Sequence, residues 1–162
     1  TLISGATALT PPANVTNINA TSAQAMYQAV MTYISNQDIF ISVAAVADYS
    51  PSKPSMQKIK KQTATLNIEL QPNKDILAEV ASLPNAPFCV GFAAETQDLL
   101  KHAETKRQAK KLHLLVANLV GESMGQDEAS ITLLDNNGGH ALPRANKKVL
   151  ASEILMHLSR LI

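Results

Sequence analysis

The chain has 162 residues and a formal net charge of +1, and it is 46% hydrophobic with 4% aromatic residues and no tryptophan. A chain of this length fits one domain and buries roughly two-thirds of its unfolded surface. The near-zero charge gives no general attraction to nucleic acid or to a membrane surface. Few aromatic side chains are available to stack single-stranded bases, and no apolar run is long enough to span a bilayer. We therefore expect neither a nucleic acid nor a membrane partner.

The single cysteine, Cys89, excludes an internal disulfide and indicates a reducing compartment, so the cytoplasm is the expected location. Cys89 lies in the apolar run 88–92, which predicts a buried, unreactive thiol. The four histidines show no ligand spacing with acidic residues or with Cys89. No structural metal site can therefore be identified from the sequence, the metal ligands stay unknown, and His157 is expected to pack at the edge of a helix.

The first half of the chain predicts short strands at 1–5 and near 15–18, then a helix capped by Thr21. Residues 39–47 form an apolar, β-branched run typical of a strand that is buried on both faces of a parallel sheet. Residues 64–70 alternate between apolar and polar, which predicts a half-exposed strand, either antiparallel or projecting as an arm. A short helix follows at 75–82.

The second half predicts buried strands at 88–94 and 113–118 around a helix at 97–111. The run 136–139 reads Asn-Asn-Gly-Gly and indicates a hairpin, and a last helix covers 146–161. Alternating strands and helices predict an α/β fold, a Rossmann-like, doubly wound and mostly parallel sheet, with a C-terminal antiparallel hairpin and a projecting arm at about 64–70. We expect residues 1–162 to form a single domain.

Three predicted strands end in a small residue followed by a polar one: Ala47–Asp48, Ala94–Glu95 and Ala117–Asn118. In open α/β sheets ligands bind at the carboxyl ends of the strands, and small residues such as Ala44 and Ala45 let backbone amides approach a base or a phosphate. Small residues equally suit tight packing of strand against helix, so both interpretations stay open.

Positive charge is local, at 53–61 and at 101–111, although the net charge is small. Lys58 follows a loop rich in proline and serine, from which it can reach the end of the sheet. Lys106 and Lys110 are four residues apart and share one helix face, which suits either a phosphate or ordinary solvation. Because a Walker loop and a dinucleotide glycine fingerprint are absent, phosphates would be held by lysines and backbone amides.

Several motifs occur in a fixed order: Ala-Ala-Val-Ala-Asp-Tyr at 44–49, Lys-Ile-Lys-Lys at 58–61, Asn-Lys-Asp-Ile-Leu at 73–77, Gly-Phe-Ala-Ala-Glu-Thr at 91–96, and the basic residues of 106–110. In this set the chain resembles bacterial phosphopantothenoylcysteine synthetase, the C-terminal half of the bifunctional coenzyme A biosynthesis protein. The resemblance covers nearly the whole chain, and its first two motifs are specific.

The resemblance implies a ligase that uses CTP with Mg²⁺ to join 4′-phosphopantothenate to cysteine through an acyl-cytidylate. It assigns Lys58 to formation of that intermediate. The expected nucleotide-binding residues are Ala44, Ala45, Asp48, Lys58, Lys74, Asp75, Ile76, Leu77, Phe92, Lys106 and Lys110. Lys74 replaces the family's proline. The resemblance also implies a homodimer, for which we assign the strand at 64–70 to the interface, and a larger oligomer where a decarboxylase domain is fused. FMN would belong only to that decarboxylase domain.

The chain departs from the family at its start, where residues 1–5 match the family's second strand. The family's first strand and the catalytic segment after it have no counterpart, so we expect a synthetase domain that lacks them. Two alternatives follow: a ligase represented by a truncated chain, or a nucleotide-binding and dimerising fragment that is inactive without its upstream segment. An unrelated Rossmann-like oxidoreductase is disfavoured because the glycine fingerprint is missing.

Overall fold

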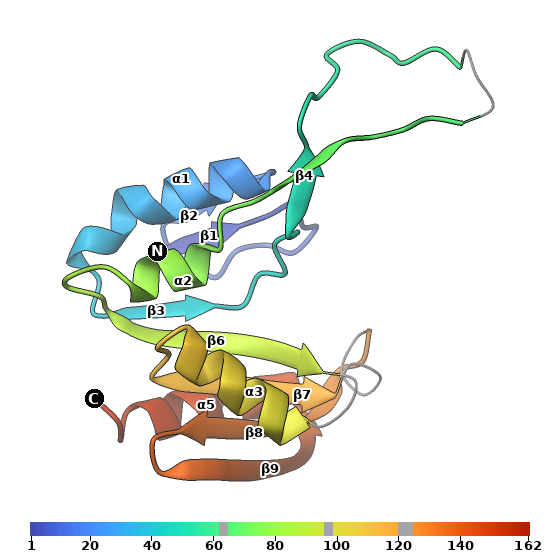
Figure 1. The fold of residues 1–162 in the computed structure, drawn as a ribbon. Helices are drawn as coiled ribbons and strands as arrows, with labels where there is room; N and C mark the ends of the chain where they lie inside the picture. Colours follow the sequence, from blue (N-terminus) through green and yellow to red (C-terminus); the bar gives the residue numbers. More distant parts are fainter. Residues whose placement is uncertain (62–64, 96–98, 120–124) are drawn as a thin grey trace. The chain divides into compact units, whose positions relative to one another are not determined.

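The computed structural model describes residues 1–61, 65–95, 99–119 and 125–162 (Figure 1). Contacts divide the chain into two compact units. Unit 1 comprises residues 1–32 and 44–76, and unit 2 comprises residues 33–43 and 77–162. The prediction of one domain over residues 1–162 stays a prediction.

Unit 2 is built on a five-stranded sheet with the order β3-β6-β7-β8-β9. Strands β3 (Ile39–Ser42), β6 (Phe88–Glu95) and β7 (Leu114–Leu119) are parallel. Strands β8 (Glu128–Asp135) and β9 (Gly138–Asn146) form an antiparallel hairpin that joins the sheet through β7. The predicted α/β class, with a mostly parallel sheet and a C-terminal hairpin, is confirmed.

Helices cover both faces of this sheet. Successive residues of β6 point to opposite faces, and both faces are apolar and buried. Val90 belongs to a buried apolar cluster with β7, β8 and helix α5 (Lys147–Leu158), which contributes Leu150, Ile154 and Leu158. A side chain at the neighbouring Gly91 would point the other way, toward Leu77 of helix α2 (Ile76–Ala81) and Leu112, which follows helix α3 (Leu99–Ala109). Figure 1 shows α3 lying across the sheet on the face opposite α5.

Strand β3 differs from its prediction. It ends at Ser42 rather than at residue 47, and β6 is its one neighbour among the described strands. Ile41 is 39% exposed and Val43 is 62% exposed. The prediction of a strand buried on both faces is therefore wrong, because this segment is the edge of the sheet rather than its centre.

Unit 1 contains a parallel pair, β1 (Leu2–Ser4) and β2 (Asn17–Asn19), followed by helix α1 (Ala23–Tyr33). The Ser22 hydroxyl accepts a hydrogen bond from the amide of Ala25 at 3.1 Å. Ser22 is thus the N-cap, and the predicted cap at Thr21 is one residue early.

The predicted arm is present in unit 1. Strands β4 (Tyr49–Pro51) and β5 (Leu70–Pro72) pair antiparallel, and residues 52–61 and 65–69 extend from this short ladder (Figure 1). Residues 65–69 carry no strand, so the strand predicted at 64–70 is confined to its last residue, and residues 62–64 lie outside the described part. Leu66, Ile68 and Leu70 are all more than half exposed. Within the described residues, none of the helices has the length and apolar character needed to cross a membrane.

Candidate nucleotide site

The predicted nucleotide residues fall in both units. Residues 44–76 of this set belong to unit 1, whereas Leu77, Phe92, Lys106 and Lys110 belong to unit 2.

In unit 1 the structure brings two of the predicted segments together. The backbone amide of Asn73 donates to the carbonyl of Asp48 at 2.8 Å, and the Asn73 side-chain amide donates to the carbonyl of Ala47 at 2.8 Å. The β4–β5 ladder begins directly after Asp48 and ends directly before Asn73, which fixes this pairing. Exposed Asp48 and the exposed pair Lys74 and Asp75 therefore lie on adjoining loops.

The small residues before Asp48 are also open to solvent. Ala44 and Ala45 are exposed, and the amide of Val46 donates to the carbonyl of Ala44 at 3.1 Å, which makes a tight turn after β3. Small side chains on a turn suit close approach of a ligand to the backbone, and the binding of a nucleotide by Ala44 and Ala45 stays a prediction.

Lys58 lies on the arm, beyond the end of the β4–β5 ladder, and is exposed. The turn before it is held by Ser55, whose hydroxyl donates to the carbonyl of Gln57 at 2.7 Å. The role of Lys58 in forming the acyl-cytidylate stays a prediction.

Three of the predicted residues have buried or half-buried side chains. Ile76 is 7% exposed and Leu77 is 9% exposed, so only their backbone groups remain for contact with a nucleotide. Phe92 is half-buried against the apolar cluster under α5. These three positions serve packing in the structure, and a role in nucleotide binding stays a prediction.

In unit 2 the carboxyl ends of the parallel strands share one edge of the sheet. Ser42 is in register with Gly91, and Ala94 is in register with Asn118. The ends of β6 and β7 therefore lie side by side, as predicted from the endings Ala94–Glu95 and Ala117–Asn118, whereas β3 already ends beside Gly91, in the middle of β6.

The basic residues in the last turn of α3 and directly after it divide into two kinds. Lys106 is exposed and Lys110 is half-buried, and the Lys110 amide donates to the Lys106 carbonyl at 3.0 Å. Arg107 is 7% exposed and turns inward, where it pairs with both carboxylate oxygens of Glu104 at 2.8 Å. The hydrogen bond from Arg107 is the main cause that lowers the pKa of Glu104. Arg107 therefore organises the unit rather than offering its charge to a phosphate.

One cluster was missed at the sequence level. Asp135, at the end of β8, is 4% exposed and lies against His140 and His157. Burial raises the pKa of this carboxyl, but hydrogen bonds from His157, the Asn137 amide and His140 outweigh burial and hold it below its usual range. The sequence did carry a signal for this cluster. Asp135 is a polar residue at the end of an alternating strand, and it lies two residues after Leu133, which pairs with His140 across the hairpin.

Residues 1–161 match the sequence model of the DNA/pantothenate metabolism flavoprotein C-terminal domain. The chain belongs to this family. The resemblance to the synthetase half of the bifunctional coenzyme A biosynthesis protein is thereby confirmed.

Within the family, a similar relative is the coenzyme A biosynthesis bifunctional protein CoaBC of Vibrio vulnificus, which is 46% identical over 168 residues. That match covers 100% of this chain and 42% of the relative, so the chain spans less than half the length of the relative. A crystal structure of the C-terminal domain of CoaBC is 34% identical, with a TM-score of 0.82 over 99% of this chain and 72% of that one. A Cab2 variant in complex with phosphopantothenate-cysteine shares the fold, with 16% identity and a TM-score of 0.70 over 90% of this chain and 53% of that one.

Proposed function

We propose that this chain carries the CTP-dependent ligation of 4′-phosphopantothenate to cysteine in coenzyme A biosynthesis. The observation that carries the proposal is the family match over residues 1–161. The relatives are named as coenzyme A biosynthesis proteins, and a protein of the same fold has been crystallised with phosphopantothenate-cysteine. The same proposal implies the cytoplasm as the location.

The chemistry consists of two displacements. A carboxylate oxygen of 4′-phosphopantothenate attacks the α-phosphorus of CTP, forming a P–O bond and releasing pyrophosphate. The amine of cysteine then attacks the acyl carbon, an amide forms, and CMP leaves as the amine loses a proton. Both steps concentrate negative charge, which cationic groups positioned in advance stabilise.

In unit 1, Asp48, Lys74 and Asp75 offer charged groups on the two loops that Asn73 joins. Mg²⁺ in nucleotide sites is bound through one or two carboxylates together with substrate phosphates. The exposed carboxylates of Asp48 and Asp75 fit this need and would hold the ion, which would neutralise charge on the phosphates. Lys74 supplies a cation beside them.

The lysines take two roles in this proposal. Lys58 moves with the arm and neutralises the charge that develops during formation of the acyl-cytidylate. Lys106 in the last turn of α3 and Lys110 directly after the helix hold the triphosphate, while the inward Arg107 does not.

The test compares Lys58→Gln with Lys53→Gln in the protein that shows turnover. Both lysines are exposed on the same arm, so both changes remove one charge without touching the core. Loss of one positioned charge costs about 10²–10³ in rate. Lys58→Gln is expected to lose pyrophosphate release by that factor, whereas Lys53→Gln stays near the parent rate; equal rates for the two variants would contradict the role of Lys58.

The triphosphate role is tested by CTP titration. Lys106→Ala and Lys110→Ala are expected to weaken binding, and the parent affinity is expected to fall with added salt. Lys101→Ala, an exposed lysine of the same helix, is the matched control. Parallel titrations with ATP measure the base preference, which these residues do not fix.

The second candidate is a nucleotide-binding and dimerising fragment that needs residues upstream of Thr1 for turnover. It is favoured by β3, whose one neighbour among the described strands is β6 and whose Ile41 is 39% exposed, since an edge strand can pair with a further strand. Residues 1–162 alone, given CTP, 4′-phosphopantothenate and cysteine, would then bind CTP but release no pyrophosphate. Turnover by residues 1–162 alone would exclude this candidate.

A further inference from the structure

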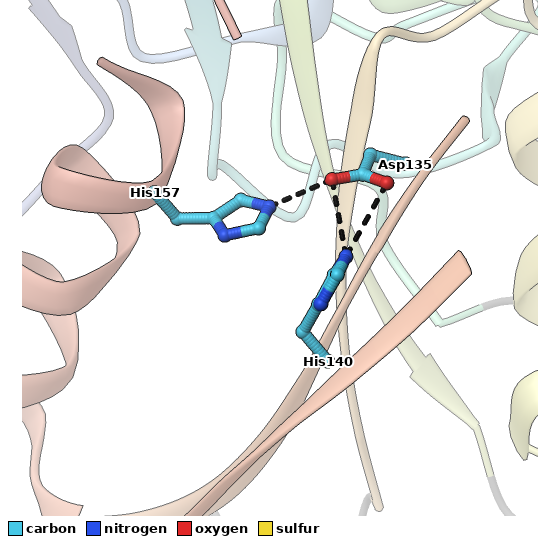
Figure 2. Close-up of side chains that lie close together, drawn as sticks. All are labelled: Asp135, His140 and His157. Atoms are coloured by element: carbon cyan, nitrogen blue, oxygen red, sulfur yellow. Dashed lines mark hydrogen bonds and ion pairs between the residues drawn. The ribbon is translucent and has the colours of Figure 1, made fainter. Parts of the chain in front are cut away.

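Three side chains from three elements of unit 2 converge on one point. Asp135 ends β8, His140 lies on β9, and His157 lies on α5 (Figure 2). The Nε2 atom of His157 is 2.8 Å from Oδ2 of Asp135, and Nε2 of His140 is 3.3 Å from the same oxygen. The two imidazole rings lie 4.7 Å apart, centroid to centroid. Two ring nitrogens thus face one carboxylate oxygen.

The local fold holds this arrangement from behind. The other oxygen of Asp135, Oδ1, accepts a hydrogen bond from the amide of Asn137 at 2.6 Å. Arg107 donates to the side chain of Asn136 at 2.9 Å, which anchors the same turn to α3. Hydrogen bonds behind a ligating carboxylate fix its orientation and are a regular part of metal sites.

We propose that Asp135, His140 and His157 bind a divalent transition metal ion such as Zn²⁺, with water completing the coordination. Each residue offers one ligand atom, and these atoms lie within 4.8 Å of one another. Metal–ligand bonds of about 2.0–2.1 Å in a tetrahedral site separate neighbouring ligand atoms by about 3.3 Å. The nitrogen–oxygen distances of 2.8 and 3.3 Å are close to this separation. Two imidazoles with one carboxylate form a donor set typical of zinc and of non-haem iron.

Burial differs across the cluster in a way that suits an entering ion. The side chain of Asp135 is 2% exposed and that of His157 is 17% exposed, whereas that of His140 is 41% exposed. The ion and its water would therefore approach past His140. Cys89, the single thiol of the chain, is fully buried and does not belong to this cluster.

The cluster is remote from the carboxyl edge of the sheet. Leu134 pairs with Leu115 in an antiparallel ladder, so Asp135 lies beside the beginning of β7 rather than its end. The carboxyl ends of β6 and β7 lie at the opposite edge. A metal here would join the β8–β9 hairpin to α5 and stabilise unit 2 without entering the proposed nucleotide chemistry.

The test is a titration of the purified protein with Zn²⁺, read by competition with a chromophoric chelator and by thermal unfolding. The expected result is one ion per chain and an unfolding temperature that rises with Zn²⁺, because binding to the folded state alone stabilises it. His140→Gln and His157→Gln are each expected to weaken binding by about 100-fold or more and to abolish the rise. His102→Gln, which changes an exposed histidine of α3, is expected to behave as the parent.

Two results would contradict a metal site at Asp135, His140 and His157. Absence of saturable Zn²⁺ binding, or retention of parent affinity by His140→Gln, would overturn it. His140 is the most exposed member, so His140→Gln remains decisive even where His157→Gln fails to fold. Co²⁺ provides a second reading, since its visible spectrum is expected to change on binding to the parent and to His102→Gln but not to His140→Gln. Neither measurement uses CTP, so the result is independent of the proposed ligase activity.

Discussion

Gly91 lies where β6 passes directly beneath three leucines. A Cβ atom at this position would be 2.8 Å from Cδ1 of Leu112, 2.8 Å from Cδ2 of Leu77 and 3.1 Å from Cδ1 of Leu115. Carbon atoms in good contact are about 3.5–4.0 Å apart. The three leucines are 3%, 9% and 2% exposed, so they have little space into which to retreat. Replacing Gly91 by alanine is therefore expected to overpack this face of the sheet.

The size of the effect follows from two opposing terms. Inserting an atom into a packed core costs about 1–3 kcal/mol, and Gly→Ala restricts the unfolded chain, which returns about 0.4–1 kcal/mol. Gly91→Ala is thus expected to lower the free energy of unfolding by about 1–2 kcal/mol. For a chain of this size this is about 2–8 °C in Tm. Far-UV circular dichroism during thermal and urea unfolding measures both quantities.

Two further variants separate overpacking from a general intolerance of change. Gly5→Ala is the control, because the nearest atom to a Cβ at Gly5 is 3.8 Å away, and it is expected to be neutral or slightly stabilising. Adding Leu112→Val to Gly91→Ala removes one of the clashing methyl groups. The double variant is therefore expected to lose less free energy of unfolding than the sum of the losses in the two single variants. A Gly91→Ala protein as stable as the parent would refute this account of the packing.

Three other predictions concern separate features. Burial raises the pKa of Cys89 to about 11, so its thiol is expected to resist a disulfide reagent at about pH 8 in the native protein and to react once denaturant is added. The pKa of Glu104 is lowered chiefly by Arg107, so the pair stabilises the fold at neutral pH and this contribution is lost as pH falls through the lowered pKa. Acid titration monitored by circular dichroism is expected to show less loss of stability in Glu104→Gln than in the parent. Leu66 and Ile68 are 63% and 61% exposed on the arm, and changing both to serine is expected to convert a dimer to a monomer in sedimentation velocity, whereas a parent that is already monomeric would contradict the interface.

The elements that could be predicted are those whose pattern is local. Strands β6 and β7 are continuous apolar runs, and the β8–β9 hairpin is marked by its turn at 136–139. Strand β3 has the same apolar character, yet it is short and exposed at the edge of the sheet. Apolar composition reports that a segment can be buried, whereas its place in the sheet depends on which other strands are present to pair with it.

The Asp135 cluster shows what spacing along the chain does not contain. Asp135 and His140 become neighbours through hairpin register, since His140 is opposite Leu133 and Asp135 is two residues further along the same face. His157 joins them only because α5 packs back on that face of the sheet. A motif search by fixed spacing therefore fails here, although hairpin register alone was sufficient to predict the first pair.

The sequence was sufficient to separate the buried from the exposed basic residues at 106–110. This separation decides which of these charges a ligand can reach. Residues four apart share a helix face, so Arg107 shares its face with Ala103, which is fully buried. Lys106 and Lys110 form a different row, and Lys106 is exposed. Helix phase thus separates an arginine that anchors the hairpin turn through Asn136 from exposed Lys106 and half-buried Lys110. A count of positive charges does not distinguish these residues. Their positions around the helix axis do, and these positions predict which basic side chains can contact a ligand.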